Sequence, residues 1–384
     1  MKVFSKSQII LALLIIQTTF SANIFAQNKE ESKITKIGII LPTSGAIASF
    51  GQESLNGVKL FISKLDKKKA AMIKLVIEDD KSEAIEATNA IRKLLNVDKV
   101  SAVVGEVTSS NTLAMAPIAQ ENKVPLFSPA ATNVKVTQVG NFISRACFTD
   151  DFQGVVMARF AIETLKKKKG MIVIDNSSDY SQGLAKAFKA EYLKLGGSFV
   201  TNEDITYVQK DTDFQSLLRK MKRANPEVVF LPGYYQEVGL IIKQARALGI
   251  TAPFLGGDGW DSPKLFEIAG PAIKGNYISS HFAPDDKSPM VIQFVKDYQK
   301  AYNSKPGAMA ALGYDAIGIV TNAIFTAKNN SSKEINNAII NTKNYNGVTG
   351  SITIDSNRNS KKSAVVLETT ANEFIFKNKV NPGQ

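Results

Sequence analysis

Two short hydroxyl-rich turns are the residues best suited to chemistry in this chain of 384 residues. The first, GEVTSSNT over 105–112, contains Ser109, and the second, SPAATN over 128–133, contains Ala130 and Thr132. Each follows an apolar, strand-like run, and the first leads into a helical pattern that we expect to begin near Thr112. Such turns offer backbone N–H groups, hydroxyl donors and the positive end of a helix dipole. The two turns are therefore predicted to be halves of one receptor for a zwitterion, although a single hydroxyl-rich turn usually only caps a helix.

The sequence offers few side chains suited to catalysis. Cys147 is the only cysteine and His281 the only histidine, so an internal disulfide is excluded and most hydrolytic and metal chemistry is disfavoured. The chain lacks both a Gly-x-Ser-x-Gly elbow and a Gly-x-x-x-x-Gly-Lys loop. Cys147 and His281 form the only nucleophile–base option, and no orienting motif stands near either. We expect a binding protein, not an enzyme, with no cofactor.

An acidic run, Glu78-Asp79-Asp80, is the one candidate for a metal site. It follows a predicted strand, and no divalent-ion loop pattern surrounds it. We interpret the acids as solvated groups at a strand end and predict no metal.

The N-terminus has the form of a secretory signal peptide. Lys2 and Lys6 precede an almost wholly apolar run over 9–16, and Ala26 is a small residue suited to the position before a cut. The alternative is an uncleaved membrane anchor. The apolar core is too short for a helix that spans the membrane. No cysteine near the cut could carry a lipid. We predict a signal peptide over 1–26 and an exported, soluble mature chain, located in the periplasm of a double-membraned bacterium.

Composition bounds the size and the partners of the mature chain. About 358 residues remain after the cut, more than one hydrophobic core usually carries, so two lobes are expected. The formal net charge is +12, but the lysines are spread along the chain and interleaved with acids. The lysine runs 67–69 and 166–169 stand at the ends of helical patterns, where cations favour the dipole. We interpret the basicity as a solvated surface and expect no nucleic-acid partner.

Strand and helix patterns alternate along the chain. Strands are predicted over 36–41, 73–77, 171–174 and 228–231, and a helix over about 82–95 with Ser82 as its N-cap. Further helices are expected over 154–165, 184–195, 214–221, 238–248, 290–302 and 310–327. Two successive series of βα units predict an α/β protein with two parallel, doubly wound lobes. The strand-like tail, 350–355 and 365–369, suits a chain that crosses back between the lobes.

A set of motifs in a specific order and spacing resembles a known family. The motifs are 42–45 (PTSG) with Gly51 and Asn56-Gly57, the two turns above, 179–183 (DYSQG), 233–235 (GYY), 256–261 (GGDGWD) and 313–316 (GYDA). Over nearly the whole mature chain they are similar to the type I periplasmic substrate-binding proteins of ABC transporters, in the branched-chain or hydrophobic amino-acid (leucine-isoleucine-valine) branch.

The resemblance implies two Rossmann-like parallel-sheet lobes joined by three crossovers, near Thr149-Asp150, His281 and Lys361. The N-terminal lobe would then comprise 34–149 and 282–361, and the C-terminal lobe 150–281 and 362–384. The ligand would lie in the cleft between the lobes, which closes like a hinge. The closed, monomeric form would be recognised by the permease subunits of an ABC transporter.

The family's polar site residues map onto four positions here. The resemblance implies that Ser109 and Thr132 meet the carboxylate of an amino acid, through charge-assisted bonds. It also implies that the carbonyl of Ala130 and the carboxylate of Asp258 accept from the ammonium. Many relatives carry glutamate where Asp258 stands, so the ligand here would sit closer or through a water. Asp258 could instead cap the next turn.

Four aromatic residues would form the walls of the site by the same resemblance: Phe50, Tyr180, Tyr234 and Trp260. Phe50 lacks a hydroxyl, which favours apolar ligand side chains. Tyr235 is expected to point elsewhere, into packing. Trp260 could equally fill the interior of its lobe without touching ligand.

The function implied is delivery of a branched-chain or other apolar amino acid to a permease. The same fold serves uptake of amides, urea and aromatic acids, as well as ligand sensing, and these alternatives stay open. Asp258 favours an amino acid, because an amide has no ammonium to pair with it.

Overall fold

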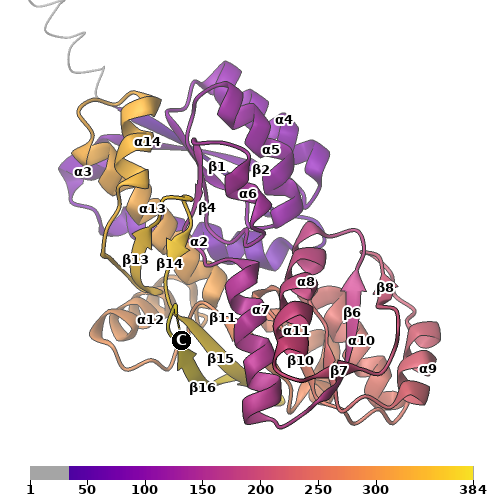
Figure 1. Cartoon of the computed structure of the whole chain (residues 1–384). Helices are drawn as coiled ribbons and strands as arrows, with labels where there is room; N and C mark the ends of the chain where they lie inside the picture. The colour runs from indigo at the N-terminus through magenta and orange to yellow at the C-terminus, as the bar shows by residue number, and fades with distance from the viewer. Residues whose placement is uncertain (1–33, 384) are drawn as a thin grey trace, which may run out of the picture.

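The computed structural model describes residues 34–383, which form two lobes, each built around its own sheet (Figure 1). The predicted signal peptide, 1–26, lies outside the described residues. The sheet of the first lobe has five parallel strands in the order β2-β1-β3-β4-β5. These strands are β1 (Thr35–Leu41), β2 (Ile73–Asp79), β3 (Ala102–Gly105), β4 (Leu126–Ser128) and β5 (Ile143–Arg145).

The second sheet has the order β16-β15-β11-β10-β9-β6-β7, with β8 also paired to β6. Its pairings from β11 to β7 are parallel, whereas β15 and β16 join antiparallel at the edge. Its strands are β6 (Lys169–Asp175), β7 (Ser198–Phe199), β8 (Ile205–Tyr207), β9 (Val228–Phe230), β10 (Phe254–Gly256), β11 (Tyr277–Ser280), β15 (Ala364–Thr369) and β16 (Phe374–Val380). The fold class predicted from the alternating pattern is confirmed.

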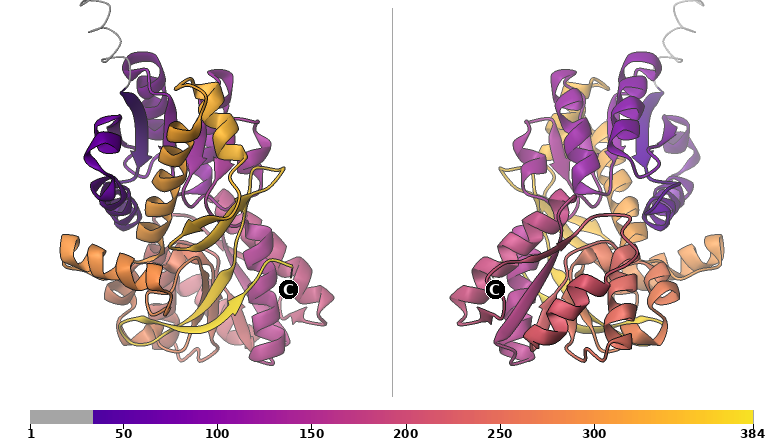
Figure 2. Two further views of the ribbon diagram at one scale, coloured as in Figure 1. Left: turned by 90° about the vertical axis from the view of Figure 1, so that its left-hand side faces the viewer. Right: turned by 90° about the vertical axis from the view of Figure 1, so that its right-hand side faces the viewer.

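The helices assigned to the first lobe are α2 (Ala48–Lys64), α3 (Lys67–Ala71), α4 (Ala84–Lys93), α5 (Ser109–Glu121), α6 (Lys135–Gln138), α12 (Pro289–Tyr302), α13 (Ala308–Thr326) and α14 (Ser332–Ile340), of which α12 packs against α2. Those of the second lobe are α7 (Asp150–Arg159), α8 (Asp179–Lys194), α9 (Gln215–Ala224), α10 (Tyr235–Ala247) and α11 (Pro263–Ala269). Both side views in Figure 2 keep the lobes stacked one above the other, with the yellow strands β15 and β16 in the second lobe.

The chain passes between the two sheets three times: between β5 and β6, between β11 and α12, and between β14 (Ser360–Lys361) and β15. A small three-stranded sheet, β12 (Tyr345–Gly347), β13 (Gly350–Ile354) and β14, precedes the third passage. The lobe limits expected at 149/150, 281/282 and 361/362 fall within these connections, and as exact limits they stay a prediction. Three backbone connections thus join the lobes, an arrangement suited to hinge motion.

Helix α13 is apolar on nearly every side and packs along α2. Of the helices in residues 34–383, it alone has the length and hydropathy of a membrane span, but 83% of that window is buried inside the protein. Such burial is typical of a central core helix. Gly57 and Gly313 allow the close approach, because a Cβ on either would lie within 2.3 Å of backbone oxygen on the other helix.

Two local predictions were wrong. Helix α5 begins at Ser109 and not near Thr112, because Thr108 is extended at the N-cap position and places the serines in the first turn. Ser82 does not cap α4, whose N-cap position is Glu83. Ser82 adopts a φ of 64°, and its hydroxyl donates to the Ser44 carbonyl, so it ties the β1–α2 loop instead.

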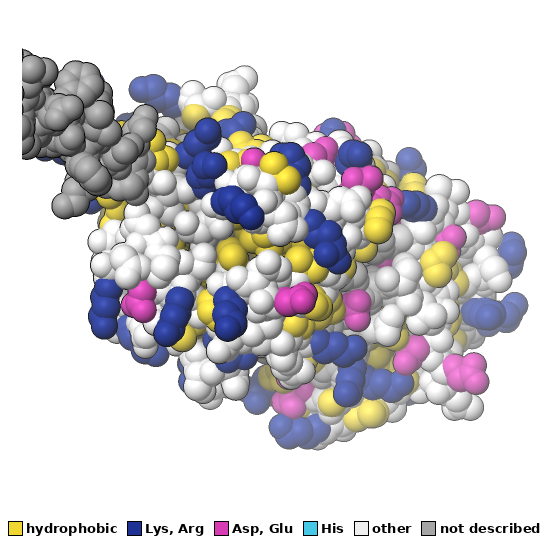
Figure 3. All heavy atoms as spheres, turned by 90° about the horizontal axis from the view of Figure 1, so that it is seen from above, with side chains coloured by type: hydrophobic (Ala, Val, Ile, Leu, Met, Phe, Trp, Pro, Cys, Tyr) yellow, Lys and Arg dark blue, Asp and Glu magenta, His cyan; other side chains and the backbone are white. Residues whose placement is uncertain are grey.

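Positively and negatively charged side chains are mixed on the surface. On the face shown in Figure 3, lysine and arginine side chains lie scattered among aspartate and glutamate. The same interleaving of signs led us to expect a solvated surface.

Candidate functional site

The two hydroxyl-rich turns lie side by side at the carboxyl ends of the neighbouring strands β3 and β4. The Ser128 hydroxyl donates to the Glu106 carbonyl at 2.6 Å, and the Asn133 N–H donates to Ser109 Oγ at 3.2 Å. These two bonds join the turns into one surface. Ligands of open parallel sheets bind at this end of the strands.

Donors for an anion are concentrated on this surface. Ser109 and Thr132 are each 1% exposed. Ser109 stands in the first turn of α5, where backbone N–H groups lack intrahelical acceptors. The buried Thr132 hydroxyl makes no hydrogen bond of good geometry among the described residues, although it lies near the Asp150 carboxyl and favours its charged form. Both hydroxyls are therefore free to donate to a carboxylate.

A buried arginine holds the second turn in shape. The Arg145 guanidinium is fully buried and donates to the Ala131 carbonyl at 2.6 Å and to the Asn133 carbonyl at 2.8 Å. The Cys147 thiol also donates to the Ala131 carbonyl, at 3.3 Å. Because the Ala131 and Asn133 carbonyls accept these hydrogen bonds, they hold the backbone of the turn that carries the Ala130 carbonyl.

Acceptors are concentrated on the second lobe. Asp258 follows β10 and is 2% exposed. Its Oδ1 accepts from Gln153 Nε2 at 3.0 Å, and its Oδ2 lies 3.0 Å from His281 Nε2. Ser262, not Asp258, caps the helix that follows, through a bond from the Lys264 N–H. The capping role left open for Asp258 is therefore not what the structure shows.

A second carboxyl group stands beside Asp258. Asp150 shares Gln153 Nε2 through its Oδ1 at 3.0 Å, while its buried Oδ2 makes no hydrogen bond in the described part of the chain. Burial, together with the charge of Asp258, raises the pKa of Asp150 to about 8. Burial lowers the pKa of His281 to about 4, so the imidazole is neutral at pH 7 and neutralises neither acid. The buried Arg145 guanidinium favours the charged form of Asp150 in part, and an ammonium group beside the two acids would stabilise them further.

Three of the four predicted aromatic residues cluster across the lobe boundary. The rings of Tyr180 and Tyr234 are stacked with centroids 5.3 Å apart, and Phe50 of α2 meets Tyr234 edge-on at 6.1 Å. The Tyr180 hydroxyl accepts from the Gly259 N–H at 3.0 Å, which ties this stack to the Asp258 turn. Tyr235 also points across the boundary, with its ring 5.0 Å from that of Phe50.

Trp260 lies apart from this cluster, in the interior of the second lobe. It is 0% exposed, its indole N–H donates to the Leu231 carbonyl at 2.9 Å, and its ring packs on Gly256. These contacts favour core packing over contact with a ligand.

The lobes are in contact on both sides of the candidate site. Ser110 Oγ donates to Asp179 Oδ2 and accepts from the Asp179 N–H, each at 3.1 Å. Asn133 Nδ2 donates to the Asp179 carbonyl at 2.6 Å. Farther out, Lys210 forms an ion pair with Glu83 at 2.7 Å. The conformation described is thus the closed one.

Sequence reasoning missed several residues that the fold brings to the site. Asp150 and Gln153 lie in the first turn of α7, and their only sequence signal is Thr149, which resembles an ordinary N-cap and does cap the helix. Glu106 directly follows β3, and its buried Oε1 has no partner among residues 34–383. Burial, then the charge of Asp80, raises the pKa of Glu106 well above its usual range.

The alternatives of metal binding and thiol chemistry find little support in the geometry. Among residues 34–383, no group of three or more His, Cys, Asp or Glu side chains could hold a metal ion. Asp79 binds the Thr43 and Ser44 N–H groups at 2.9 and 3.2 Å, as a loop anchor does. Burial raises the pKa of the Cys147 thiol to about 12, which keeps it protonated and unreactive.

Known proteins are similar to this chain over most of its length. Residues 35–368 match the family model described as periplasmic binding protein. The chain is 38% identical to a leucine-binding protein, LivK, from Thermotoga maritima, with a TM-score of 0.87 and coverage of 91% of this chain and 99% of that one. It is 35% identical to the branched-chain amino-acid transporter substrate-binding protein LivJ from Streptococcus pneumoniae in complex with isoleucine, with a TM-score of 0.85 and coverage of 91% and 100%.

A curated relative points the same way. The Leu/Ile/Val-binding protein homolog 2 of Brucella abortus is 29% identical over 336 residues, which cover 86% of this chain and 89% of the relative. Because the family model spans most of the chain, the resemblance drawn from the motifs is confirmed: the chain belongs to the periplasmic binding protein family.

Proposed function

We propose that this protein is the substrate-binding receptor of an ABC importer and that it binds the zwitterion of a branched-chain or other apolar amino acid. One observation carries the proposal: buried hydroxyl donors of the first lobe lie beside a buried pair of acids, Asp150 and Asp258, that belongs to the second. Ser109 and Thr132 have 1% exposure each on the donor side, and Asp258 has 2% on the acceptor side. An amino-acid zwitterion matches both halves at once.

Each half has a defined role in the proposal. Ser109 and Thr132 donate to the ligand carboxylate, which also gains from the N-terminus of α5. The Ala130 carbonyl and the Asp258 carboxylate accept from the ammonium. Asp150, whose Oδ2 is unpaired, supplies a further acceptor that compensates for the two oxygens of Asp258 already bonded to Gln153 and His281.

Selectivity for apolar side chains would come from the aromatic cluster. Phe50, Tyr180 and Tyr234 offer ring faces and edges, and the edge of Phe50 carries no hydroxyl to hydrogen-bond a polar ligand. The LivJ structure from Streptococcus pneumoniae holds isoleucine, which is a ligand of this class.

Closure couples binding to delivery. Bonds such as Ser110–Asp179 form only when the lobes meet, so a ligand held by both lobes shifts the population towards the closed form. The permease then recognises that form. We place the receptor in the periplasm, exported by a cleaved signal peptide over 1–26, and propose that it acts as a monomer without a catalytic step.

The alternative is a receptor or sensor of the same fold for amides, urea or aromatic acids. It differs chemically in that these ligands lack an ammonium, which would leave Asp150 and Asp258 buried without an ammonium partner. Such an arrangement is costly for two neighbouring carboxyl groups.

A thermal-shift screen tests the proposal. The mature protein would be unfolded and refolded to remove carried-over ligand, then heated with each common amino acid, urea, short amides and aromatic acids. A ligand that binds only the folded state raises Tm. A shift with leucine, isoleucine or valine would support the proposal. A shift confined to compounds without an ammonium would overturn it in favour of the alternative.

A further inference from the structure

A cavity of about 730 Å³ lies at a second place on the lobe boundary, outside the candidate amino-acid site. It is enclosed by α2, the α11 region, the connection after β11, the loop before α13 and the β15–β16 hairpin. None of the eight residues predicted for the amino-acid site lines it. Its walls are rich in rings, which include Tyr235, Phe266, Phe282, Tyr298, Pro306 and Phe374.

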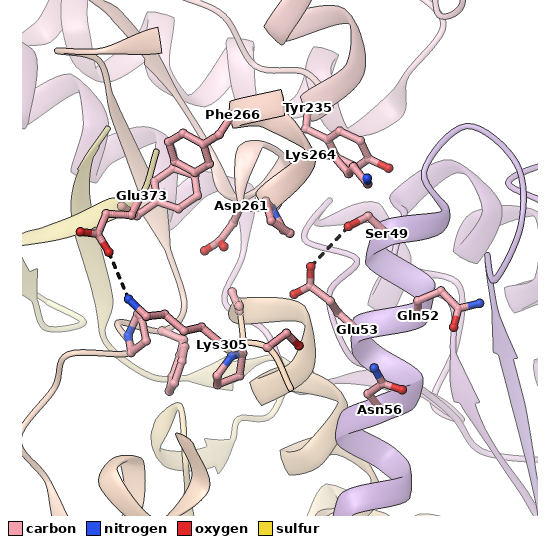
Figure 4. A pocket seen from close by; sticks show the side chains of 18 of the residues that line it. Ser49, Gln52, Glu53, Asn56, Tyr235, Asp261, Lys264, Phe266, Lys305 and Glu373 are labelled. Carbon is pink, nitrogen blue, oxygen red and sulfur yellow. Dashed lines mark hydrogen bonds and ion pairs between the residues drawn. The ribbon is translucent and has the colours of Figure 1, made fainter. Parts of the chain in front are cut away.

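Two carboxyl groups from different lobes point into this cavity. Figure 4 shows Glu53 of α2 and Asp261 directed towards one another across the open space. Glu53 Oε1 accepts from Ser49 Oγ at 3.3 Å, but its Oε2 is buried and has no hydrogen-bond partner in residues 34–383. Asp261 is 4% exposed, its Oδ2 accepts from Ser280 Oγ, and the Ala308 N–H also favours its charged form.

The position of Gly307 shows that Glu53 Oε2 and Asp261 Oδ1 lie close to one another. A Cβ added to Gly307 would stand 2.6 Å from Glu53 Oε2 and 3.3 Å from Asp261 Oδ1. The two oxygens therefore flank the same backbone position, close enough for one ammonium group to bond to both beside the N–H groups of Gly307 and Ala308, which already favour the charged carboxylates.

The pair lacks a cationic partner inside the cavity. Lys264 and Lys305 also line the cavity, but they pair with Glu267 at 2.7 Å and with Glu373 at 3.2 Å. Both lysines are more than half exposed along their side chains. Two facing carboxylates without a counter-ion repel one another, and burial makes that repulsion stronger.

The pKa values of both carboxyl groups reflect the lack of a cationic side chain beside them. Burial, then the charge of Asp261, raises the pKa of Glu53 to about 8. Burial also raises the pKa of Asp261 to about 6, with a further contribution from Asp258. The other ionisable side chains lining the cavity are Tyr235, Lys264, Tyr298, Lys305 and Glu373. At neutral pH the empty pair keeps a proton on Glu53, which a cation would displace.

We propose that this cavity is a second ligand site, which binds a primary ammonium compound with an apolar body between Glu53 and Asp261. The ammonium N–H groups would bond to Glu53 Oε2 and Asp261 Oδ1, and the rings would cover the apolar part. A ring wall suits an organic amine better than a hydrated metal ion, which prefers several oxygen ligands.

Occupancy of this site favours the closed form. The cavity wall includes contacts that cross between the lobes, such as Ser49 Oγ to Ser262 Oγ at 2.9 Å and the Tyr235 hydroxyl to the Ala46 carbonyl at 3.3 Å. In an open form Glu53 and Asp261 would separate. An amine that bridges them therefore acts as an effector of closure, distinct from the transported ligand.

Calorimetric titration of the ligand-stripped protein with phenethylammonium tests the site. We expect saturable binding that weakens about tenfold or more in Glu53→Gln and in Asp261→Asn, since each removes one of two charged acceptors. Glu267→Gln, a change to an exposed carboxylate outside the cavity lining, is the matched control and should bind as the wild type does. Gly307→Ala should also abolish binding, because its methyl group would occupy the gap.

Further measurements keep the site separate from the amino-acid site. Ser109→Ala should lose amino-acid binding yet keep phenethylammonium binding, even if the ligand class proposed above is wrong. Binding should become tighter between pH 6 and pH 8 with release of protons to the buffer, while 3-phenylpropionate, an anion of similar shape, should not bind. Unchanged affinity in both Glu53→Gln and Asp261→Asn, or loss of phenethylammonium binding in Ser109→Ala, would overturn the proposal.

Discussion

His281 Nε2 lies 3.0 Å from Asp258 Oδ2, and the ring of Phe148 stacks on the imidazole at 3.6 Å between centroids. His281 opens the second connection between the lobes, whereas Phe148 stands in the first. The contact therefore joins the hinge to the acceptor proposed for the ligand ammonium. Because the imidazole is neutral, it orients Asp258 by a hydrogen bond without cancelling its charge.

The protonation of His281 can be measured directly, because it is the only histidine in the chain. Burial lowers its pKa to about 4, so the imidazole proton signals in an NMR titration should keep their neutral positions down to about pH 5. The unfolded chain binds this proton from about pH 6.5. Unfolding therefore takes up a proton between these values, and the free energy of unfolding should fall as pH falls from 6.5 to 4. The loss is on the order of 3 kcal/mol.

The variant His281→Asn isolates this contribution. The difference between wild type and variant in the pH dependence of urea unfolding should follow the single histidine. A midpoint near 6.5 in the NMR titration of the folded protein would contradict the expectation.

Asp150 should affect stability with a pH dependence opposite to that of His281, and the variant Asp150→Asn tests this. The pKa of Asp150 is raised to about 8 by burial, so its contribution is present below the unfolded pKa and is lost as pH rises towards 8. The ligand-free variant should therefore gain stability relative to wild type at pH 8, by about 1 to 3 kcal/mol, and little at pH 4. Denaturant unfolding at both values measures it. Equal differences at the two pH values would indicate a purely steric effect.

Ser109→Ala should weaken amino-acid binding by about tenfold or more, because a buried charge loses one donor. The matched control is Thr88→Ala, which removes an exposed hydroxyl bonded only to the Ile85 carbonyl of its own helix. Calorimetry with the ligand found in the thermal-shift screen gives both affinities. Wild-type affinity in Ser109→Ala would remove this residue from the site.

Asp179→Ala should shift the lobes towards the open form. It removes the side chain that accepts from Ser110 Oγ at 3.1 Å in a partly buried contact between the lobes. We expect amino-acid affinity to fall about threefold to tenfold and the radius of gyration of the ligand-bound protein in X-ray scattering to rise.

Lys210→Ala provides the comparison, because its pair with Glu83 also spans the lobes but is exposed, at 67% and 49% of the two side chains. Exposed ion pairs contribute little, so this variant should bind as the wild type does. A larger loss in Lys210→Ala than in Asp179→Ala would show that buried contacts do not hold the lobes together.

Trp260→Phe should reduce stability by about 2 to 3 kcal/mol, since it leaves a cavity and the Leu231 carbonyl without its donor. Amino-acid affinity should change little. Trp260 is the only tryptophan, so the variant has none, and denaturant unfolding of both proteins is followed by circular dichroism instead of fluorescence. A large loss of affinity at unchanged stability would instead place the indole against the ligand.

The amino-acid sequence determined the alternating strands and helices, because apolar periodicity and turn residues are local properties. Long, strongly patterned elements such as β1 and α13 were predicted to within about two residues of their limits. Short strands such as β5 and β8, of three residues each, were not, since so few residues carry little periodicity. The two hydroxyl-rich turns were found from sequence because each directly follows a strand.

Only the tertiary structure decided which acids and aromatic rings share a site. Asp150 and Asp258 are far apart in sequence, yet they share the amide of Gln153, because α7, which begins at Asp150 after β5 of the first sheet, packs beside the turn that follows β10 of the second. Trp260 belongs to the core although it stands two residues from Asp258, since its side chain turns inward to the Leu231 carbonyl. The Glu53–Asp261 pair arises only when the lobes close. Local sequence sets backbone conformation, but the meeting of distant side chains depends on packing that no short segment encodes.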